Sequence, residues 1–415
     1  MKFTYNNTSI PLILASNIHY CIAICLCLLV TESSYCQNLI SVDQAIDLSL
    51  TKNPQMKLAD QKIDIQKSLI PSAFNLNNIE FVFQSPDGHG LRPTLYHIID
   101  FPTVYAAQYE AQKSQVKISE ADKRVTTNQI KYSVRTTYLT LQYQISRKEI
   151  LRKYDSLLSD LLDVNSLRYG VGQISKLEKV NGEAKYYLIQ NQLRQTVVEL
   201  KNARLLLSYL FGSPGDTTYM PTDKFSKNLT DINENLIDTS LSNNPLTDYY
   251  NQQVSLSRKQ LKVESSRALP GFVWGFFNQA TPLDKTPIGV QFMYGINVPF
   301  AFWSYSAKIK GAKKGIEATT TQMRVNKNRL SADYSQALSQ YTQYEQSLNY
   351  FETIGLEQSK EIIKNARQSF KSGAIGYYFY LQNLDQAFQI ELNYLEVLKN
   401  YNQSIINLRY IKGEL

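Results

Sequence analysis

Apolar residues recur at intervals of three and four over most of the chain, which predicts a mainly helical protein. One such stripe contains Ile130, Val134 and Tyr138. We expect a very long helix over about residues 103–168 and a second helix over about 175–210. Both lie in a part of the sequence that contains no proline, so no proline interrupts either helix.

Two stretches alternate between apolar and polar residues instead, which predicts β-strands. IEFVFQ places Ile79, Phe81 and Phe83 on one side, and the turn-forming SPDGHGLRP separates it from TLYHII. The second half repeats this pattern as GFVWGFFNQ and IGVQFMYGINV, separated by ATPLDKTP. We expect one strand pair over about 78–100 and another over about 271–298.

The same order of elements occurs twice along the chain. IDLSLTKNP at 46–54 and IDTSLSNNP at 237–245 agree at six of nine positions. Each opens a succession of helix, two strands, long helix, tight turn and helix. We therefore predict a first repeat over 37–212, a linker rich in Pro, Asp, Asn and Thr over 213–235, and a second repeat over 236–415.

Helix lengths indicate an extended molecule. In the second repeat a long helix is expected over about 304–371, with a tip at 371–376, and the first repeat has its tip at 168–174. The long helix of the first repeat would reach about 95–100 Å at 1.5 Å per residue, and its two shorter helices together would match that length. A rod two helices wide cannot hold an ordinary globular core, so we expect a coiled-coil stalk or one part of a larger helical wall.

All four cysteines lie within the first 36 residues. They accompany the run IHYCIAICLCLLV, about 13 residues that are too short to span a bilayer and typical of a signal peptide. We expect residues 1–36 to be removed by cleavage after Cys36. A lipoprotein acylated at Cys36 is the alternative. In both cases the exported chain has no disulfide, so packing or assembly must stabilise it.

Charge and hydropathy argue against two classes of protein, nucleic-acid-binding proteins and helical inner-membrane proteins. The net charge of +8 is spread along the chain, and no nucleic-acid-reading motif accompanies it, so we expect no nucleic-acid partner. After the predicted signal peptide, no run of 18 or more apolar residues remains, so a helical inner-membrane protein is not expected. Membrane-spanning β-strands are shorter and alternate, and a hydropathy scan does not detect them.

Large aromatic residues gather around the two strand pairs. Aromatic girdles at the bilayer interfaces explain this pattern, and a small soluble β-sandwich with an aromatic core is the alternative. Four strands cannot close a barrel and open sheet edges are not tolerated in lipid, so several chains would have to combine. The candidate membrane belt comprises Tyr96, Phe101, Tyr105, Trp274, Phe276, Phe292, Tyr294, Phe300 and Trp303.

This ordered set of motifs resembles the TolC-like outer-membrane efflux protein family. The matching motifs are SLTKNP and SLSNNP, DFPTVY and NVPFAFW, and the turns LRYGVGQISKLE and FKSGAIGYYFYLQNLDQA. The closing ELNYLEVLKNYNQSIINLRYIKG is also similar, and the resemblance covers about 41–212 and 236–413. It implies a homotrimer with a 12-stranded β-barrel in the outer membrane, continuous with a 12-helix α-barrel in the periplasm.

The resemblance also implies partners. A periplasmic adaptor (membrane fusion) protein would dock at the tips, and an inner-membrane RND pump would supply energy to a passive exit duct. Such a duct is not an enzyme and needs no cofactor. The residues that match the docking turns are Arg168, Tyr169, Gly170, Gly172, Ser175, Lys371, Gly373 and Gly376.

The cargo is less sharply indicated. DFPTVYAAQYEAQKSQVKISEADKR and YYFYLQNLDQAFQIELNYLEVLKNYNQ are most similar to members that accompany RND pumps for heavy-metal cations. A multidrug or type I secretion duct is the alternative within transport. An exported coiled-coil structural or chaperone protein is the alternative from another class.

The predicted periplasmic mouth departs from the family. Members commonly carry acidic residues soon after the tip glycine, but the second repeat has no carboxylate there until Asp385. No metal site is expected in this chain, because His89, His97 and the scattered methionines form no group of soft ligands. We expect the mouth to be closed by aromatic packing and Lys/Glu pairs, from Lys176, Glu178, Lys179, Tyr377, Tyr378, Phe379 and Tyr380.

Overall fold

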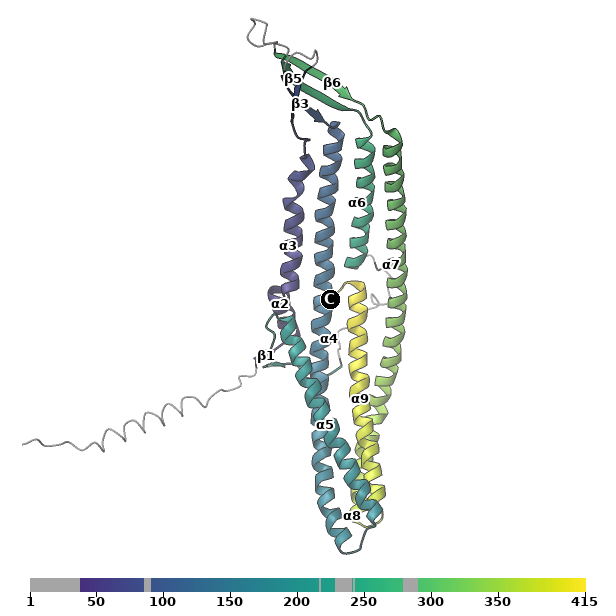
Figure 1. The fold of residues 1–415 in the computed structure, drawn as a ribbon. Helices are drawn as coiled ribbons and strands as arrows, with labels where there is room; N and C mark the ends of the chain where they lie inside the picture. The colour runs from purple at the N-terminus through teal and green to yellow at the C-terminus, as the bar shows by residue number, and fades with distance from the viewer. Residues whose placement is uncertain (1–37, 86–90, 216–217, 228–240, 242, 279–289) are drawn as a thin grey trace, which may run out of the picture.

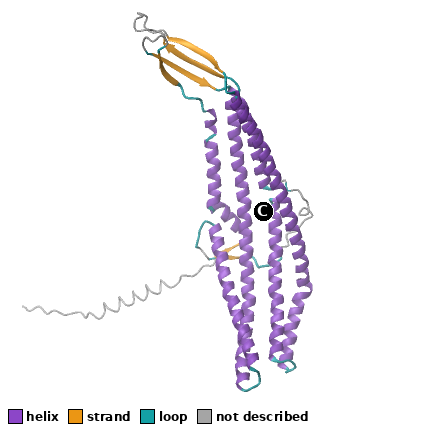
Figure 2. Ribbon diagram, turned by 45° about the vertical axis from the view of Figure 1, so that its right-hand side comes forward, coloured by secondary structure: helices purple, strands orange, loops and turns teal. Residues whose placement is uncertain are grey.

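The molecule is a long wall of helices with a four-stranded sheet at one end (Figures 1 and 2). The structure is a computed structural model that describes residues 38–85, 91–215, 218–227, 241, 243–278 and 290–415. The predicted signal peptide with Cys36, His89, the ATPLDKTP turn and much of the linker lie outside these residues.

Two helical hairpins form the end farthest from the sheet (Figure 1). In the first, α4 (Pro102–Gly170) runs the length of the wall and α5 (Lys176–Leu210) returns beside it. With 69 residues, α4 is about 100 Å long. In the second, α7 (Phe302–Tyr350) leads to α8 (Leu356–Lys371), and α9 (Tyr377–Lys412) returns.

The helix predicted over about 304–371 contains a π-helical turn at Phe351–Gly355, which lies between α7 and α8. Such a turn inserts an extra residue and so rotates the following helix about its axis. Gly355 is buried in it, and a Cβ there would lie 2.9 Å from Cδ1 of Phe351. After the turn, α8 packs on α9, where Ser359 donates a hydrogen bond to the Ala387 carbonyl at 3.0 Å. Periodicity alone does not register a single inserted residue.

Shorter helices continue the wall toward the sheet. They are α2 (Val42–Lys52) and α3 (Pro54–Ser68), with a 3-10 turn at Ile70–Phe74, and α6 (Pro245–Arg267). α3 lies above the end of α5, and α6 lies above the end of α9 (Figure 1). The wall is thus formed by α3, α4, α6 and α7 near the sheet and by α5, α4, α9 and α7–α8 near the tips.

The two Asn-Pro motifs make the same hydrogen bonds at these joints. The Asn53 side chain accepts from the backbone N–H two residues later at 2.8 Å and donates to the Leu210 carbonyl at 3.0 Å. Asn244 does the same at 2.7 Å and donates to the Ile411 carbonyl at 2.6 Å. Proline suits the next position, because the first N–H of a helix has no partner in the helix. Each motif therefore starts an upper helix and binds the end of a lower one.

The core is a line of clusters along the wall. A cluster near the joints packs α2 against α4 and α5, and a C-terminal cluster packs α7 against α9. The third, here called the tip cluster, contains Leu151, Tyr154, Leu158, Ile189, Leu384 and Phe388. None of the helices within the described ranges is both long and apolar enough to cross a membrane.

The sheet joins the two halves of the chain. It contains β2 (Glu80–Gln84), β3 (Arg92–Ile99), β5 (Gly271–Asn278) and β6 (Val290–Asn297), in that order and all antiparallel. The central pairing of β3 with β5 connects the two hairpins. A small parallel pair, β1 (Asn38–Ile40) with β4 (Tyr219–Pro221), was not predicted.

The register gives the sheet two unlike faces. Residues opposite each other in an antiparallel pair point to the same side of the sheet. One side, here called the aromatic face, carries Phe81, Phe83, Leu95, His97, Ile99, Phe272, Trp274, Phe276, Phe292, Tyr294 and Ile296. The other, the polar face, carries Glu80, Val82, Gln84, Arg92, Thr94, Tyr96, Gly275, Gln291, Met293 and Gly295, together with the apolar Ile98, Val273 and Phe277.

Candidate functional site

Both tips reverse the chain with the same backbone loop. After α4, Gly172 has φ +74°, and the Gln173 N–H donates to the Arg168 carbonyl at 2.8 Å. After α8, Gly373 has φ +77°, and the Ala374 N–H donates to the Ser369 carbonyl at 2.9 Å. These are Schellman motifs, in which a left-handed glycine ends the helix and its last carbonyls gain partners.

Only one of the two glycines predicted at each tip is required by this geometry. Gly170 is the last helical residue of α4, and Gly376 precedes α9 with φ −74°. A Cβ at either position would meet nothing within 4 Å. Gly172 and Gly373 are the positions where any other residue would be strained.

The helices that leave the tips begin differently. Ser175 and Glu178 form a capping box: the Glu178 N–H donates to Ser175 Oγ at 3.2 Å, and the Ser175 N–H donates to Glu178 Oε2 at 2.9 Å. The carboxylate of Glu178 is therefore not in the Lys/Glu pair predicted for the mouth. Lys179 pairs with Glu183 at 3.8 Å, and Lys176 is exposed. Gly376 supplies no side-chain cap to α9.

The tyrosines of the second tip divide between core and surface. Tyr377 and Tyr380 are only 3% and 4% exposed, so the prediction that they face the mouth is wrong. Tyr380 stacks on Phe370 with ring centroids 4.5 Å apart, because both rings belong to the packing between α8 and α9. Desolvation by burial raises the pKa of both tyrosines. Tyr378 and Phe379 are the exposed members, at 47% and 58%.

A charged contact ties the two hairpins together above the tips. Lys185 of α5 forms an ion pair with Asp385 of α9, and the Tyr154 hydroxyl of α4 lies 3.5 Å from the same carboxylate. Burial first, and then the charge of Asp385, raises the pKa of Tyr154. Asp385 thus carries a neutralising partner within its own chain.

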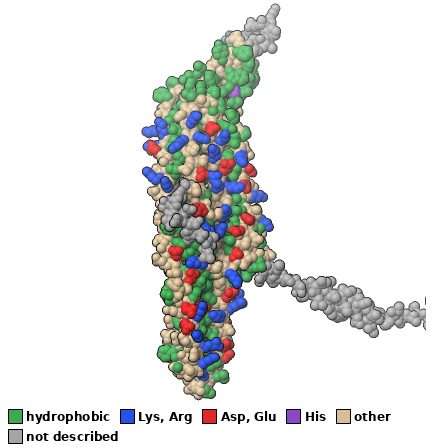
Figure 3. Space-filling view, turned by 180° about the vertical axis from the view of Figure 1, so that it is seen from behind, with side chains coloured by type: hydrophobic (Ala, Val, Ile, Leu, Met, Phe, Trp, Pro, Cys, Tyr) green, Lys and Arg blue, Asp and Glu red, His purple; other side chains and the backbone are tan. Residues whose placement is uncertain are grey.

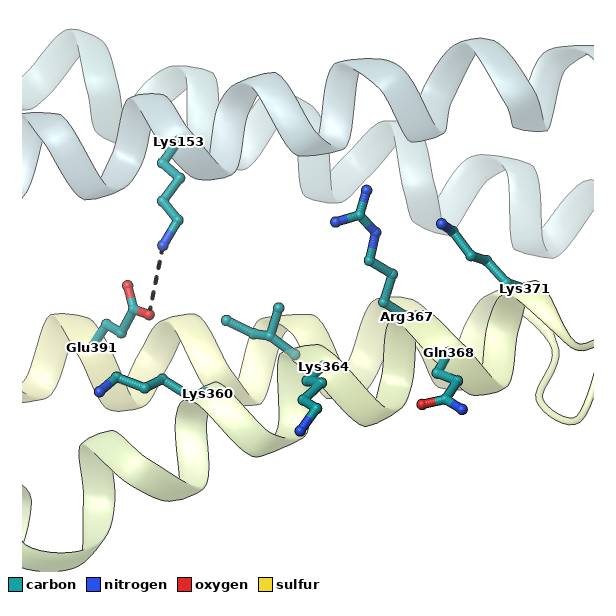
Figure 4. A pocket seen from close by; sticks show the side chains of 8 residues that line it. Lys153, Lys360, Lys364, Arg367, Gln368, Lys371 and Glu391 are labelled. Atoms are coloured by element: carbon teal, nitrogen blue, oxygen red, sulfur yellow. Dashed lines mark ion pairs between the residues drawn. The ribbon is translucent and has the colours of Figure 1, made fainter.

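A basic groove opens beside the second tip (Figure 4). Its volume is about 600 Å³, and it lies between α4 and the α8–α9 hairpin. On α8, Lys360, Lys364, Arg367 and Lys371 follow at intervals of four, three and four, so they share one face. Across the groove, Lys153 and Glu391 form an ion pair at 3.9 Å. Sequence reasoning named only Lys371, although the spacing of the four basic residues could have revealed the stripe.

The first tip presents an apolar surface that sequence reasoning also missed. Leu167, Val171 and Leu177 are 75%, 71% and 69% exposed. Arg168 turns away from them, with its guanidinium 5.0 Å from the Phe370 ring of the other hairpin. Tyr169 is 40% exposed and lies under the Lys179 ammonium. The apolar residues within the turn motif LRYGVGQISKLE could have indicated this surface from the sequence.

Of the predicted membrane belt, most members lie on the aromatic face or at the boundary between sheet and helices. Tyr105 is an error: it belongs to α4, is 8% exposed, and its hydroxyl accepts from the Asp100 N–H at 3.1 Å. Tyr96 lies on the polar face, where its hydroxyl donates to Glu80. Phe101 stacks on Phe272 at 5.9 Å. The exposed members are Trp274, Phe292, Tyr294, Phe300 and Trp303.

His97 is a packed side chain in this arrangement. Its Nε2 lies 2.7 Å from the Asn77 carbonyl, and its ring meets Trp274 edge to face at 5.9 Å. Within the described part of the chain, no three His, Cys, Asp or Glu side chains gather as a metal site would need.

Comparisons with known proteins identify the fold. No family model matches the sequence, and no curated protein matches it. The CmeC outer membrane channel of Campylobacter jejuni matches with TM-score 0.74 and 16% identity, over 90% of this chain and 85% of that one. The outer membrane protein VceC of Vibrio cholerae matches with 0.75 and 13%, over 90% and 96%. The open-state MtrE outer membrane channel of Neisseria gonorrhoeae matches with 0.72 and 15%, over 90% and 88%.

CmeC and MtrE are outer membrane channels, and VceC is an outer membrane protein. At such low identities the likeness concerns the fold, and it extends over nine-tenths of this chain. The chain therefore has the fold of outer-membrane channels, as its resemblance to the TolC-like family predicted.

Proposed function

We propose that the protein is a passive exit duct in the outer membrane, where the sheet spans the bilayer and the helices extend into the periplasm. The observation that carries this is the pair of unlike sheet faces. Phe292 and Tyr294 are 74% and 89% exposed on the aromatic face of a single chain. A soluble protein gains nothing from such a surface, whereas lipid covers it. The polar face, with its glycines, then lines water.

A homotrimer closes the sheet. Within the described residues, β2 and β6 each have one strand neighbour, and lipid does not tolerate open edges. Three copies supply twelve strands, since each chain contributes four. They also supply twelve helices near the sheet and twelve near the tips, because each chain contributes four at each level. One duct can therefore continue from barrel to helical wall without a change of symmetry.

The tips are the proposed docking site for a periplasmic adaptor protein, and an inner-membrane RND pump would drive the cargo. Exposed Leu167, Val171 and Leu177 support this, because apolar side chains at a helix tip favour a protein partner. Heavy-metal cations are the proposed cargo on the strength of the two similar sequence stretches; a multidrug or type I secretion duct would use the same architecture. If the cargo is a metal, its selection belongs to the pump and adaptor.

For the mouth, we infer closure by the exposed Tyr378 and Phe379 instead of by an acidic ring. Asp385 is paired with Lys185, which supports this inference. Millimolar divalent cations should then leave the conductance of reconstituted channels nearly unchanged. Strong block that disappears in Asp385→Asn would contradict an aromatic mouth.

Two measurements test the channel itself. The protein should fractionate with the outer membrane and give discrete conductance steps in planar bilayers. Release in soluble form, without a need for detergent, would instead favour the structural or chaperone protein that the sequence left open.

Docking can be tested by crosslinking in cells. Because no cysteine follows Cys36, a single introduced cysteine is unique in the chain after signal cleavage. Ser166→Cys and Ser372→Cys place one at each tip, and Ser306→Cys places the control near the sheet. We expect both tip variants, but not the control, to capture a periplasmic adaptor. Capture at Ser306 alone would overturn the assignment of the tips.

A further inference from the structure

The first turns of α7, directly below the sheet, combine exposed aromatic and basic residues on one face. Phe302 and Trp303 are 72% and 60% exposed. Lys310 and Lys314 follow Trp303 by seven and eleven residues, and Lys313 follows Phe302 by eleven. At about 100° per residue, each of these lysines lies within about 20° of its aromatic residue around the helix. The three lysines are also exposed.

Only one of the three lysines on this face has an acidic partner in the described part of the chain. The first acidic residue of α7 is Glu317, which pairs with Lys314 at 2.7 Å. Among the described residues, no carboxylate lies within ion-pair distance of Lys310 or Lys313. Figure 3 shows Lys and Arg side chains on the helices beneath the hydrophobic end of the molecule.

The helix end itself adds to the attraction for anions. Ala301 provides no side-chain cap to α7, whereas Asn53, Ser175 and Asn244 cap α3, α5 and α6. An uncapped N-terminus keeps the positive end of the helix dipole directed at whatever lies beyond it. In the proposed orientation, that is the membrane surface.

We propose that this face of α7 binds the headgroups of anionic phospholipids in the leaflet nearest the helices. The inference rests on the proposed placement of the sheet in the outer membrane. If Trp303 marks the interface, Lys310 lies about 10 Å and Lys313 about 15 Å below it. The headgroup layer is about 5–8 Å thick, and the flexible lysine stem reaches back toward it. Both lysines therefore lie within about one Debye length of the lipid phosphates.

A second copy of the chain is the competing occupant of this surface. α7 lies at one edge of the wall, opposite α3, so a neighbouring chain lies beside it in a closed trimer (Figure 1). The alignment with Trp303 and Phe302 favours lipid, because these rings belong at a membrane boundary and not between packed helices.

The test uses the purified trimer in detergent with dioctanoyl phosphatidylglycerol or dioctanoyl phosphatidylcholine, and native mass spectrometry counts the lipids retained. We expect the wild type to prefer phosphatidylglycerol, and the preference to weaken as salt rises. The double variant Lys310→Gln/Lys313→Gln should reduce that preference about five-fold for each lysine removed. The matched control, Lys360→Gln/Lys364→Gln, removes the same charge at the tip groove and should change nothing.

Three results would overturn the proposal: no preference in the wild type, equal loss in the control variant, or dissociation of the Lys310→Gln/Lys313→Gln trimer in place of lipid loss. The last would assign the lysines to the contact between chains. Conductance in bilayers of neutral phosphatidylcholine separates this test from that of the channel. If the wild type conducts there but shows no lipid preference, only the lipid site fails.

Discussion

The first and second tips turn the chain with one loop geometry, yet they present different surfaces. Around Gly172 the exposed side chains include the apolar Leu167, Val171 and Leu177, while α8 leads to Gly373 with a stripe of basic residues. Ser175 caps the helix after the first tip, and Gly376 leaves the second without a side-chain cap. A reversal between helices constrains the backbone and hence one glycine. It does not constrain what the turn shows to a partner, so the two tips can serve different contacts.

The Asn-Pro joints behave in the opposite way. Asn53 and Asn244 are both buried, and both bind a carbonyl at the end of a lower helix as well as the N–H two residues on. The side-chain oxygen and nitrogen of each asparagine both have hydrogen-bond partners inside the wall, so the two copies share this residue. A buried polar side chain whose hydrogen bonds are all made restricts the residue at its position, whereas an exposed turn leaves most of its side chains unrestricted.

The largest effect is expected at the joints. Asn53→Ala and Asn244→Ala each remove a helix cap and leave a buried carbonyl without its partner, which should cost about 2–3 kcal/mol. Denaturant midpoints measure this. Asn349→Ala, at an exposed position within α7, is the control and should stay within about 0.5 kcal/mol. Similar midpoints for the joint and control variants would mean that the joints are not structural.

Substitution by alanine should change stability in different directions at different tip glycines. Gly172→Ala and Gly373→Ala force a Cβ into the left-handed region and should destabilise by about 1–2 kcal/mol. Gly170→Ala lies at the last helical position, in open space, and should be neutral or stabilising. Hydrogen exchange of the amides in the adjoining helical turns measures the change in stability in each variant. A loss of the same size at Gly170 would show that a contact, and not backbone conformation, selects glycine there.

The capping difference between the tips predicts a smaller effect. Ser175→Ala should destabilise the start of α5 by about 1 kcal/mol, because the capping box is lost. Gly376→Ser supplies the second tip with the missing cap and should gain only a few tenths of a kcal/mol. Local hydrogen exchange in the first turns of α5 and α9 measures each change. Equal changes in stability at the two positions would contradict a difference in capping between the two tips.

The smallest effect at neutral pH is expected from Tyr154, a buried tyrosine of α4 in the tip cluster. The pKa of Tyr154 is raised in the folded protein, so its neutral form contributes stability that is complete below the unfolded value near 10. That contribution is lost as pH rises above 10, when the unfolded chain releases the proton first. Tyr154→Phe should flatten the fall in denaturant midpoint between pH 9 and pH 11. An unchanged slope would refute the role of Tyr154.

Much of the wall could be read from the sequence, because helix periodicity persists over many turns and the strands alternate cleanly. The π turn at Phe351–Gly355 could not, since one inserted residue leaves the local pattern intact and matters only when α8 packs on α9. At the tips, the turn motifs located the loops. They did not distinguish Tyr377 from Tyr378. These adjacent residues are both tyrosines, and only the packing of α8 on α9 decides that Tyr377 is the buried one.

By itself, the sequence determined the helix and strand order, the glycine reversals and the aromatic character of the strand pairs, since each depends on residues close together in the chain. Tertiary structure alone decided what depends on residues far apart. It joined Asn53 to Leu210 and Asn244 to Ile411, and it neutralised Asp385 with Lys185. It also set the β3–β5 register, which divides the sheet into its aromatic and polar faces. Local patterns fix local conformation, whereas a buried contact exists only once packing has brought its two partners together.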